Sequence, residues 1–253
     1  MIPKIIHYCW LSSDPIPLQF EEYIKSWKVH LPDYEFMLWN FDTFDIDESI
    51  WVKEAFENKR YAFAADYIRL FAVYNYGGIY LDMDVELLKS FNPFLELNSI
   101  ICYEKQGPHF EMAAFGALKG SLWIKTCLTY YEKRHFINKG EPDTKILPIV
   151  IKEVLASDFT IVPVSSLAEA SLQKNDPYEI KVLPSEYFSP KYYWTGKVEI
   201  TNNTVCIHHF FGSWLPQYLK IEAMIYKGLG IKNFKIIERM TWKLRALKLM
   251  IFK

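Results

Sequence analysis

The sequence predicts an α/β fold with a mixed central sheet, because short apolar runs typical of strands alternate with segments that carry apolar residues at helical spacing. The first run, residues 5–10, ends in the loop-forming residues 11–15 and is typical of a buried strand. A helical pattern follows over residues 17–30, and residues 34–39 favour a second strand. Strand and helix therefore alternate from the start of the chain.

Residues 50–76 predict two helices with a break near Asn58, since their apolar residues recur at helical spacings. The two glycines at residues 77–78 end the second helix, because glycine accepts the left-handed backbone that a C-terminal cap requires. Residues 79–81 then predict a strand that is too apolar to lie at a sheet edge.

The remainder of the chain predicts a further helix and several more strands. The helix is expected over residues 122–134, and the strands over residues 100–103, 113–118, 158–164, 180–183 and 204–211. We expect these elements to form one domain, residues 1–230, because no internal repeat or low-complexity segment divides the chain.

Composition and charge exclude several classes of protein. Of the 253 residues, 51% are apolar and 17% aromatic, which suits a packed core and excludes extensive disorder. The net charge of -1 gives no overall attraction to nucleic acid, so no nucleic-acid partner is expected. The 4 cysteines lie far apart, which argues against a zinc site or a disulfide framework and for a reducing cytosol. No signal peptide or apolar run of about 20 residues is predicted.

Asp82 and Asp84 directly follow the apolar strand at residues 79–81, at the edge where open α/β sheets bind ligands. Two carboxylates held this close repel each other and need a cation or a proton as compensation. Mg²⁺ and Mn²⁺ prefer carboxylate, water and phosphate oxygens, so this pair suits a metal that is completed by a diphosphate. An isolated Asp-x-Asp pattern is a weak signal, and its context decides its meaning.

The context is a long motif around this pair. Residues 61–70 are Tyr-Ala-Phe-Ala-Ala-Asp-Tyr-Ile-Arg-Leu, and residues 74–84 are Tyr-Asn-Tyr-Gly-Gly-Ile-Tyr-Leu-Asp-Met-Asp. This region resembles the sugar-binding region of glycosyltransferase family 32, the bacterial capsule and lipopolysaccharide transferases related to yeast mannosyltransferases and to the clostridial glucosylating toxins. Further segments look like motifs of the same family in the same order, at residues 2–10, 26–27, 32–34, 39–40, 207–209 and 212–214.

The resemblance implies a GT-A type, Rossmann-like nucleotide-sugar transferase fold with a mixed central sheet and a helical C-terminal extension. It implies retaining, metal-dependent transfer of a hexose from a UDP-sugar, such as UDP-galactose, UDP-glucose or an N-acetylated form. The cofactor would be Mn²⁺ or Mg²⁺, and the acceptor a lipid-linked or growing surface glycan, as in capsular polysaccharide or lipopolysaccharide biosynthesis. Two alternatives stay open: a catalytically inactive nucleotide-sugar-binding protein, and a nucleotide-sugar hydrolase.

The site residues of the family map onto matching positions of this chain. The implied catalytic residues are Asp66, Arg69, Asp82 and Asp84. Asp66 and Arg69 resemble the pair that contacts the donor sugar, and they lie one helical turn apart. Asp82 and Asp84 are the implied metal ligands together with His209, with His208 as the second choice. Since neighbouring strand residues point to opposite faces, at most one of these histidines should reach the metal.

The resemblance also implies a donor-binding set. Its members are His7, Tyr8, Trp10, Asp66, Arg69, Asp82, Ser213 and Trp214. The end of the first strand would hold the base and ribose, and Ser213 and Trp214 would donate to the diphosphate. His7 is also typical of a structural residue, and Trp10 of core packing. No nucleophile is assigned; Glu111 and Asp143 are candidates only as acids in the middle of the chain.

The C-terminal tail, residues 231–253, predicts a basic amphipathic helix, because Lys and Arg far outnumber its single acid, Glu238, and its apolar residues share one face. Such a helix either packs on its own domain or contacts an anionic membrane, where each Lys or Arg gains roughly 1 kcal/mol. We favour the membrane, since family relatives of this size often act on lipid-linked glycans. The expected location is the cytoplasm, with peripheral attachment to the inner face of the cell membrane.

Overall fold

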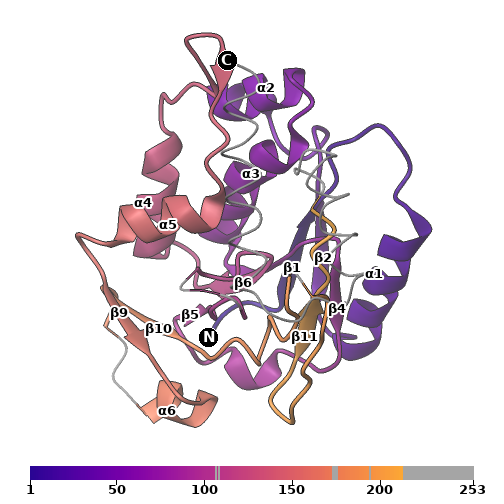
Figure 1. The fold of residues 1–253 in the computed structure, drawn as a ribbon, viewed down its shortest axis with the longest axis vertical. Helices are drawn as coiled ribbons and strands as arrows, with labels where there is room; N and C mark the ends of the chain where they lie inside the picture. Colours follow the sequence, from indigo (N-terminus) through magenta and orange to yellow (C-terminus); the bar gives the residue numbers. More distant parts are fainter. Residues whose placement is uncertain (106, 108, 173–175, 194, 213–253) are drawn as a thin grey trace, which may run out of the picture.

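A 5-stranded mixed sheet forms the centre of the molecule in a computed structural model of the chain (Figure 1). The structure describes residues 1–105, 107, 109–172, 176–193 and 195–212. The strand order is β2-β1-β3-β6-β5, with β1 Ile5–Cys9, β2 Glu35–Trp39, β3 Gly78–Leu81, β5 Ser99–Ile100 and β6 Ala114–Ala117. β1 is parallel to β2 and β3, whereas β6 is antiparallel to β3 and β5. The predicted α/β fold with a mixed sheet is confirmed.

Helices cover both faces of this sheet (Figure 1). One face shares a core with α2 (Ile50–Glu57), α3 (Tyr61–Tyr76), α4 (Leu122–Tyr131) and α5 (Leu147–Leu155). The other face packs on α1 (Leu18–His30). Side chains alternate along β3, so Tyr80 joins the core on the α3 side and Ile79 and Leu81 join the core on the α1 side. β3 is therefore buried on both faces, as its apolar sequence predicts.

Short elements outside the main sheet complete the described part of the chain. β4 (Val85–Leu87) pairs antiparallel with β11 (Cys206–His208), and β9 (Thr160–Pro163) pairs parallel with β10 (Glu179–Val182). The others are the hairpin β7 (Ile137–Asn138) and β8 (Glu141–Pro142), the 3-10 helices η1 (Ile46–Glu48) and η2 (Asn92–Phe94), and α6 (Leu167–Leu172). Of these, the β4–β11 ladder matters most for the site, because it continues the chain directly beyond β3.

Most predicted elements are present with shifted ends. The helix break falls at residues 58–60, and Ser49 caps the start of α2 by accepting a hydrogen bond from the Val52 N–H. The strand predicted at residues 204–211 is confined to β11, and α5 and α6 were not predicted. The tail at residues 231–253 lies outside the described residues, so its helix stays a prediction. Among the described residues, no helix has both the length and the apolar character needed to cross a bilayer.

Gly78 allows β3 to lie close to β1. Its φ is +101°, and a Cβ at this position would lie 2.6 Å from the carbonyl oxygen of Ile5. Both the left-handed backbone and the contact therefore exclude a side chain.

Replacing Gly78 by Ala should destabilise the protein by more than about 1 kcal/mol, because the substitution adds a backbone clash to the cost of a positive φ. Gly120→Ala is the matched control, since Gly120 has a φ of +72° but its Cβ would meet no atom within 4 Å. Urea unfolding of both variants measures the difference. Equal losses of stability would show that the contact with Ile5 has no effect.

Candidate functional site

Asp82 and Asp84 flank a tight turn at the carboxyl end of β3. The Asp82 N–H donates to the Ala113 carbonyl at 2.8 Å, which extends the ladder between β3 and β6. The Val85 N–H donates to the Asp82 carbonyl at 3.0 Å and closes the turn. Backbone hydrogen bonds therefore fix the Asp-x-Asp pair at the edge of the sheet where the sequence analysis expects a ligand.

The strand β11 brings a histidine to this turn. Its pairing with β4 places His208 opposite Val85, and His208 Nε2 lies 3.6 Å from the Oδ2 atom of Asp84. Within the described residues, one ligand atom each from Asp82, Asp84 and His208 lie within 4.8 Å of one another. Two carboxylates and an imidazole at this separation fit a divalent cation, with the carboxylates suited to Mn²⁺ or Mg²⁺.

Glu111 lies behind His208 in the interior. Its side chain is 1% exposed, and each of its carboxylate oxygens is 3.1 Å from His208 Nδ1. The Ala113 N–H also donates to Glu111 Oε1 at 2.9 Å. A buried carboxylate requires such partners, because it loses its hydration shell. His208 therefore links Glu111 on one side of its ring to Asp84 on the other.

The charges in this group shift one another's pKa values. Burial alone would raise the pKa of Asp84, but His208 and the N–H of Phe211, which donates to Asp84 Oδ2 at 2.8 Å, lower that pKa to about 2. Burial acts to lower the pKa of His208, yet Glu111 and Asp84 raise it well above its usual value. His208 therefore supplies the positive charge that these two carboxylates require.

Arg69 brings a second positive charge to the site from α3. Its terminal nitrogens lie 3.2 and 3.3 Å from the Asp82 carboxylate and 3.3 Å from Asp66, and one of them donates to the Met112 carbonyl at 3.0 Å. The ring of Tyr80 lies 4.7 Å from the guanidinium, and its hydroxyl donates to Asp82 at 2.8 Å. Burial raises the pKa of Asp66 to about 7, against the lowering effect of Arg69. The structure thus gathers the implied catalytic residues into one group.

The backbone N–H of His209 donates to the Asp84 carbonyl at 2.9 Å, but its ring does not join the ligand atoms of the two aspartates. Its ring stacks on Tyr23 with centroids 4.7 Å apart, and its Nε2 donates to Glu86 at 2.9 Å. Lys191 Nζ donates to its Nδ1 at 3.2 Å. The family resemblance implied His209 ahead of His208 as a metal ligand. The geometry reverses this order, because His208 Nε2 lies near Asp84.

His7 takes a structural place instead of a place in a donor pocket. The residue is fully buried, its Nε2 donates to the Gly77 carbonyl at 2.7 Å, and its Nδ1 accepts from Trp39 Nε1 at 3.1 Å. Burial lowers the pKa of His7 to about 4, so the neutral ring is the stable form. Both ring nitrogens are used within the protein, and His7 ties β1 to the end of α3.

The other implied donor-binding residues lie at the end of β1 or beyond the described chain. Tyr8 is half-buried and packs edge-on against Trp27 with ring centroids 5.5 Å apart. Trp10 is half-buried, and its Nε1 donates to the Asp14 carbonyl at 2.8 Å. The predicted diphosphate contacts at residues 213–214 lie outside the described residues. Contact of Tyr8 and Trp10 with a nucleotide stays a prediction.

Each candidate nucleophile is held by another side chain. The carboxylate of Glu111 is held by His208, and Asp143 accepts from Arg134 at 3.2 Å. Tyr80, Glu86 and the Glu111–His208 contact had no role assigned from the sequence. Tyr80 and Glu86 lie two residues before and after the Asp-x-Asp pair, and this period of two was a usable signal. Glu111 gave none, since only the pairing of β6 with β3 brings it to the turn.

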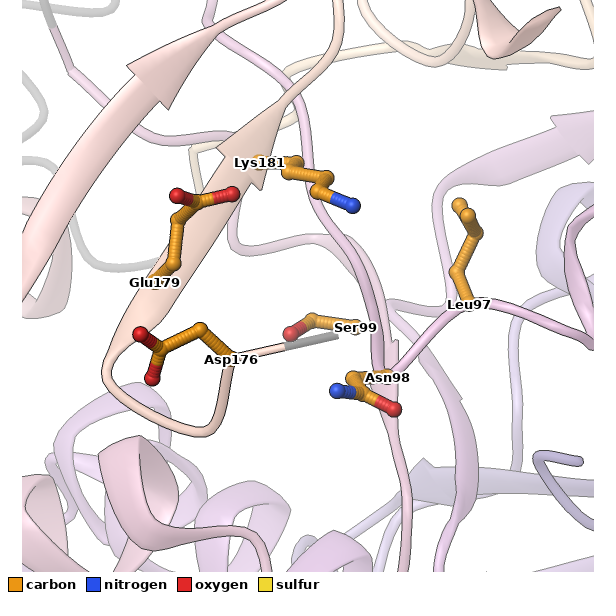
Figure 2. A pocket seen from close by; sticks show the side chains of 6 residues that line it. All are labelled: Leu97, Asn98, Ser99, Asp176, Glu179 and Lys181. Atoms are coloured by element: carbon orange, nitrogen blue, oxygen red, sulfur yellow. The ribbon is translucent and has the colours of Figure 1, made fainter. Parts of the chain in front are cut away.

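Two cavities lie apart from the acidic group. One pocket has a volume of about 10 Å³. Its lining side chains, shown in Figure 2, are Leu97, Asn98, Ser99, Asp176, Glu179 and Lys181. This volume admits about one water molecule, so the pocket is too small for a substrate. A cleft of about 490 Å³ is lined by Glu48, Ser49, Ile50, Tyr67, Tyr131, Glu132, Lys133 and His135. Since Tyr67 follows Asp66 in α3, this helix borders both the larger cleft and the acidic group.

A family match covers the first part of this site. Residues 17–104 match the family described as "Glycosyltransferase sugar-binding region containing DXD motif". The matched segment contains Asp66, Arg69, Asp82 and Asp84 and ends before Glu111 and His208. The predicted resemblance to a sugar-binding region with this motif is confirmed.

Known proteins resemble this chain over different shares of its length. Inositol phosphoceramide mannosyltransferase 3 of Schizosaccharomyces pombe is 37% identical over 98 residues, which cover 37% of this chain and 27% of the relative. An uncharacterized glycosyltransferase of Acanthamoeba polyphaga mimivirus is 26% identical over 241 residues, which cover 90% of this chain and 89% of the relative. The chain thus spans about a quarter of the fungal relative. The narrower assignment to bacterial capsule or lipopolysaccharide enzymes stays a prediction.

One solved structure with a similar chain path is that of the PaToxG glycosyltransferase. Its TM-score is 0.47 with 18% sequence identity, and the match covers 61% of this chain and 69% of that chain.

Replacing His208 by Ala should weaken Mn²⁺ binding at least about tenfold. Removing a residue that only hydrogen-bonds to a metal ligand already weakens metal affinity about tenfold, and His208 itself faces the aspartates. His209→Ala is the matched control and should leave the affinity within about twofold. The electron paramagnetic resonance signal of free Mn²⁺ measures both dissociation constants. A larger loss in the His209 variant would restore the original order of the two histidines.

Proposed function

We propose that this chain is a glycosyltransferase that transfers a sugar from a nucleoside diphosphate sugar, with a divalent cation held by Asp82, Asp84 and His208. The proposal rests on the convergence of these three side chains at the end of β3, next to Arg69. The match of residues 17–104 to a sugar-binding region with the same Asp-x-Asp motif supports it.

The arrangement suits cleavage of the bond between a sugar and a diphosphate. This reaction develops negative charge on the leaving diphosphate and positive charge at the anomeric carbon. When bound, Mn²⁺ or Mg²⁺ would supply the charge that stabilises the leaving group. Asp66 and Arg69 would orient the sugar, and Arg69 is already fixed by Asp82 and the Met112 carbonyl, so little freedom is lost on binding.

The donor in this proposal is a UDP-hexose, and the acceptor is a growing or lipid-linked glycan, with retention at the anomeric carbon. The name of the fungal relative favours one specific rival donor, a mannosyl nucleotide such as GDP-mannose. A pocket distinguishes such donors by the hydrogen bonds of single hydroxyls and of the base. The choice between them is therefore made by a screen of donors.

Two other functions are less well supported. A binding protein without catalysis needs the sugar contacts but need not keep a complete cation site, whereas Asp82, Asp84 and His208 remain together here. A hydrolase would use the same cation and sugar contacts, and the match of residues 17–104 to a glycosyltransferase sugar-binding region favours transfer instead.

In a screen that includes GDP-mannose, the full chain with Mn²⁺ should release a nucleoside diphosphate from UDP-sugars. Where no glycan acceptor is added, the sugar passes to water and the released diphosphate still reports cleavage of the donor. Asp84→Asn should lower the turnover at least about 100-fold, because it removes a charge that holds the cation. The asparagine oxygen can still accept from the Phe211 N–H, so the local turn should persist. Release from no nucleotide sugar at all, or equal turnover in the Asp84 variant, would refute the proposed function.

Peripheral attachment to an anionic membrane through residues 231–253 belongs to the same proposal. Reversing two charges of this tail with Lys232→Glu and Lys235→Glu should weaken binding to phosphatidylserine vesicles at least about tenfold, since each basic residue gains roughly 1 kcal/mol there. Lys25→Glu with Lys53→Glu is the control, because both side chains are exposed elsewhere, at 65% and 47%. Equal sedimentation of both variants and the wild type would contradict membrane attachment by the tail.

A further inference from the structure

We propose that Glu111 is a positioning residue that fixes the ring of His208 so that Nε2 faces Asp82 and Asp84. This inference rests on the proposed function, because it assigns His208 to the same cation site. Neither the family match, which ends at residue 104, nor the acidic motif includes Glu111.

Both carboxylate oxygens of Glu111 contact His208. Glu111 is 1% exposed, and both of its oxygens lie 3.1 Å from His208 Nδ1. Its Oε1 also accepts from the Ala113 N–H at 2.9 Å. The carboxylate is therefore held by the backbone on one side and by the imidazole on the other. These contacts offset part of the loss of water that a group this buried suffers.

A second observation concerns the elements that carry the two residues. Glu111 lies just before β6, and its N–H donates to the Cys102 carbonyl at 2.9 Å. β6 pairs with β3, and next to this pairing the Asp82 N–H donates to the Ala113 carbonyl. His208 belongs instead to β11, which pairs with β4. The Glu111–His208 contact thus joins the β4–β11 ladder to the main sheet. It sets the distance between the histidine and the two aspartates.

The consequence is a defined tautomer at the metal-facing nitrogen. With Nδ1–H donating to Glu111, loss of the Nε2 proton to a binding cation leaves the lone pair of Nε2 on the side of Asp84, 3.6 Å from its Oδ2. A carboxylate on the outer nitrogen fixes ring orientation and increases the basicity of a ligating histidine. The ring of Phe210, with its centroid 3.9 Å from that of His208, limits rotation further. Glu111 acts through His208 and touches no reacting atom.

The test compares Mn²⁺ affinity in the full chain, measured from the resonance signal of free Mn²⁺. Glu111→Gln should weaken binding 10- to 100-fold, the usual effect of removing an outer partner of a metal ligand. Glu54→Gln is the matched control, because Glu54 accepts from His135 Nδ1 at 2.7 Å and from the Ile137 N–H at 3.0 Å without belonging to the cation site. The control should bind Mn²⁺ as the wild type does.

A double-mutant cycle separates positioning from general structural damage. In a His208→Ala background, Glu111→Gln should cause no further loss of Mn²⁺ affinity, because its effect passes through the histidine. Additive losses, or an unchanged affinity in the single Glu111 variant, would overturn the inference. Where Glu111→Gln does not fold by circular dichroism, Glu111→Asp replaces it and should give a smaller loss in the same direction. A wild-type chain that binds no Mn²⁺ would instead refute the proposed function itself.

Discussion

The candidate site depends on one constraint: carboxylates lie close together at the end of β3, and each needs a positive charge within reach. Arg69 lies 3.2 Å from Asp82, whereas Asp84 and Glu111 share His208. Removing one partner from a buried pair typically costs about 3–5 kcal/mol, because the other charge is left uncompensated. These charges compensate one another only if α3, β3, β6 and β11 lie close together. The central sheet brings these elements together.

The two aspartates of the motif differ in their pKa values, although only one residue separates them in the sequence. Asp84 is held charged by His208 and by the Phe211 N–H, which lower its pKa to about 2. Burial raises the pKa of Asp82, whose carboxylate accepts from Arg69 and from the Tyr80 hydroxyl. A cation that enters the site must replace the proton of His208 that faces Asp84, and it must compete with Arg69 for Asp82. Metal affinity therefore falls as the contacts of the aspartates with the protein's own positive groups become stronger.

Local patterns in the sequence predicted the strand that carries the motif and the helix that carries Asp66 and Arg69. The apolar run before Asp82 and the two glycines at residues 77–78 were sufficient for this, because both signals act within one element. The choice between His208 and His209 was not predictable in the same way. It depends on the phase of β11 against β4, a ladder of three-residue strands whose register no local pattern encodes. The α5 helix was missed because residues 147–151 form a nearly continuous apolar run with a proline, and such a run does not show helical periodicity.

The boundary of the family match shows how the site is divided along the chain. Residues 17–104 supply two ligands of the candidate cation site and the residues next to them, but the histidine and the carboxylate behind it come from residues 111 and 208. The matched segment alone thus leaves Asp84 without the imidazole that compensates its charge. A chain that shares only this segment must supply an equivalent positive group or ligand from another element. Similarity in the Asp-x-Asp region is therefore evidence for the two aspartate ligands alone. The long-range pairing of β11 with β4 decides whether a histidine lies beside them.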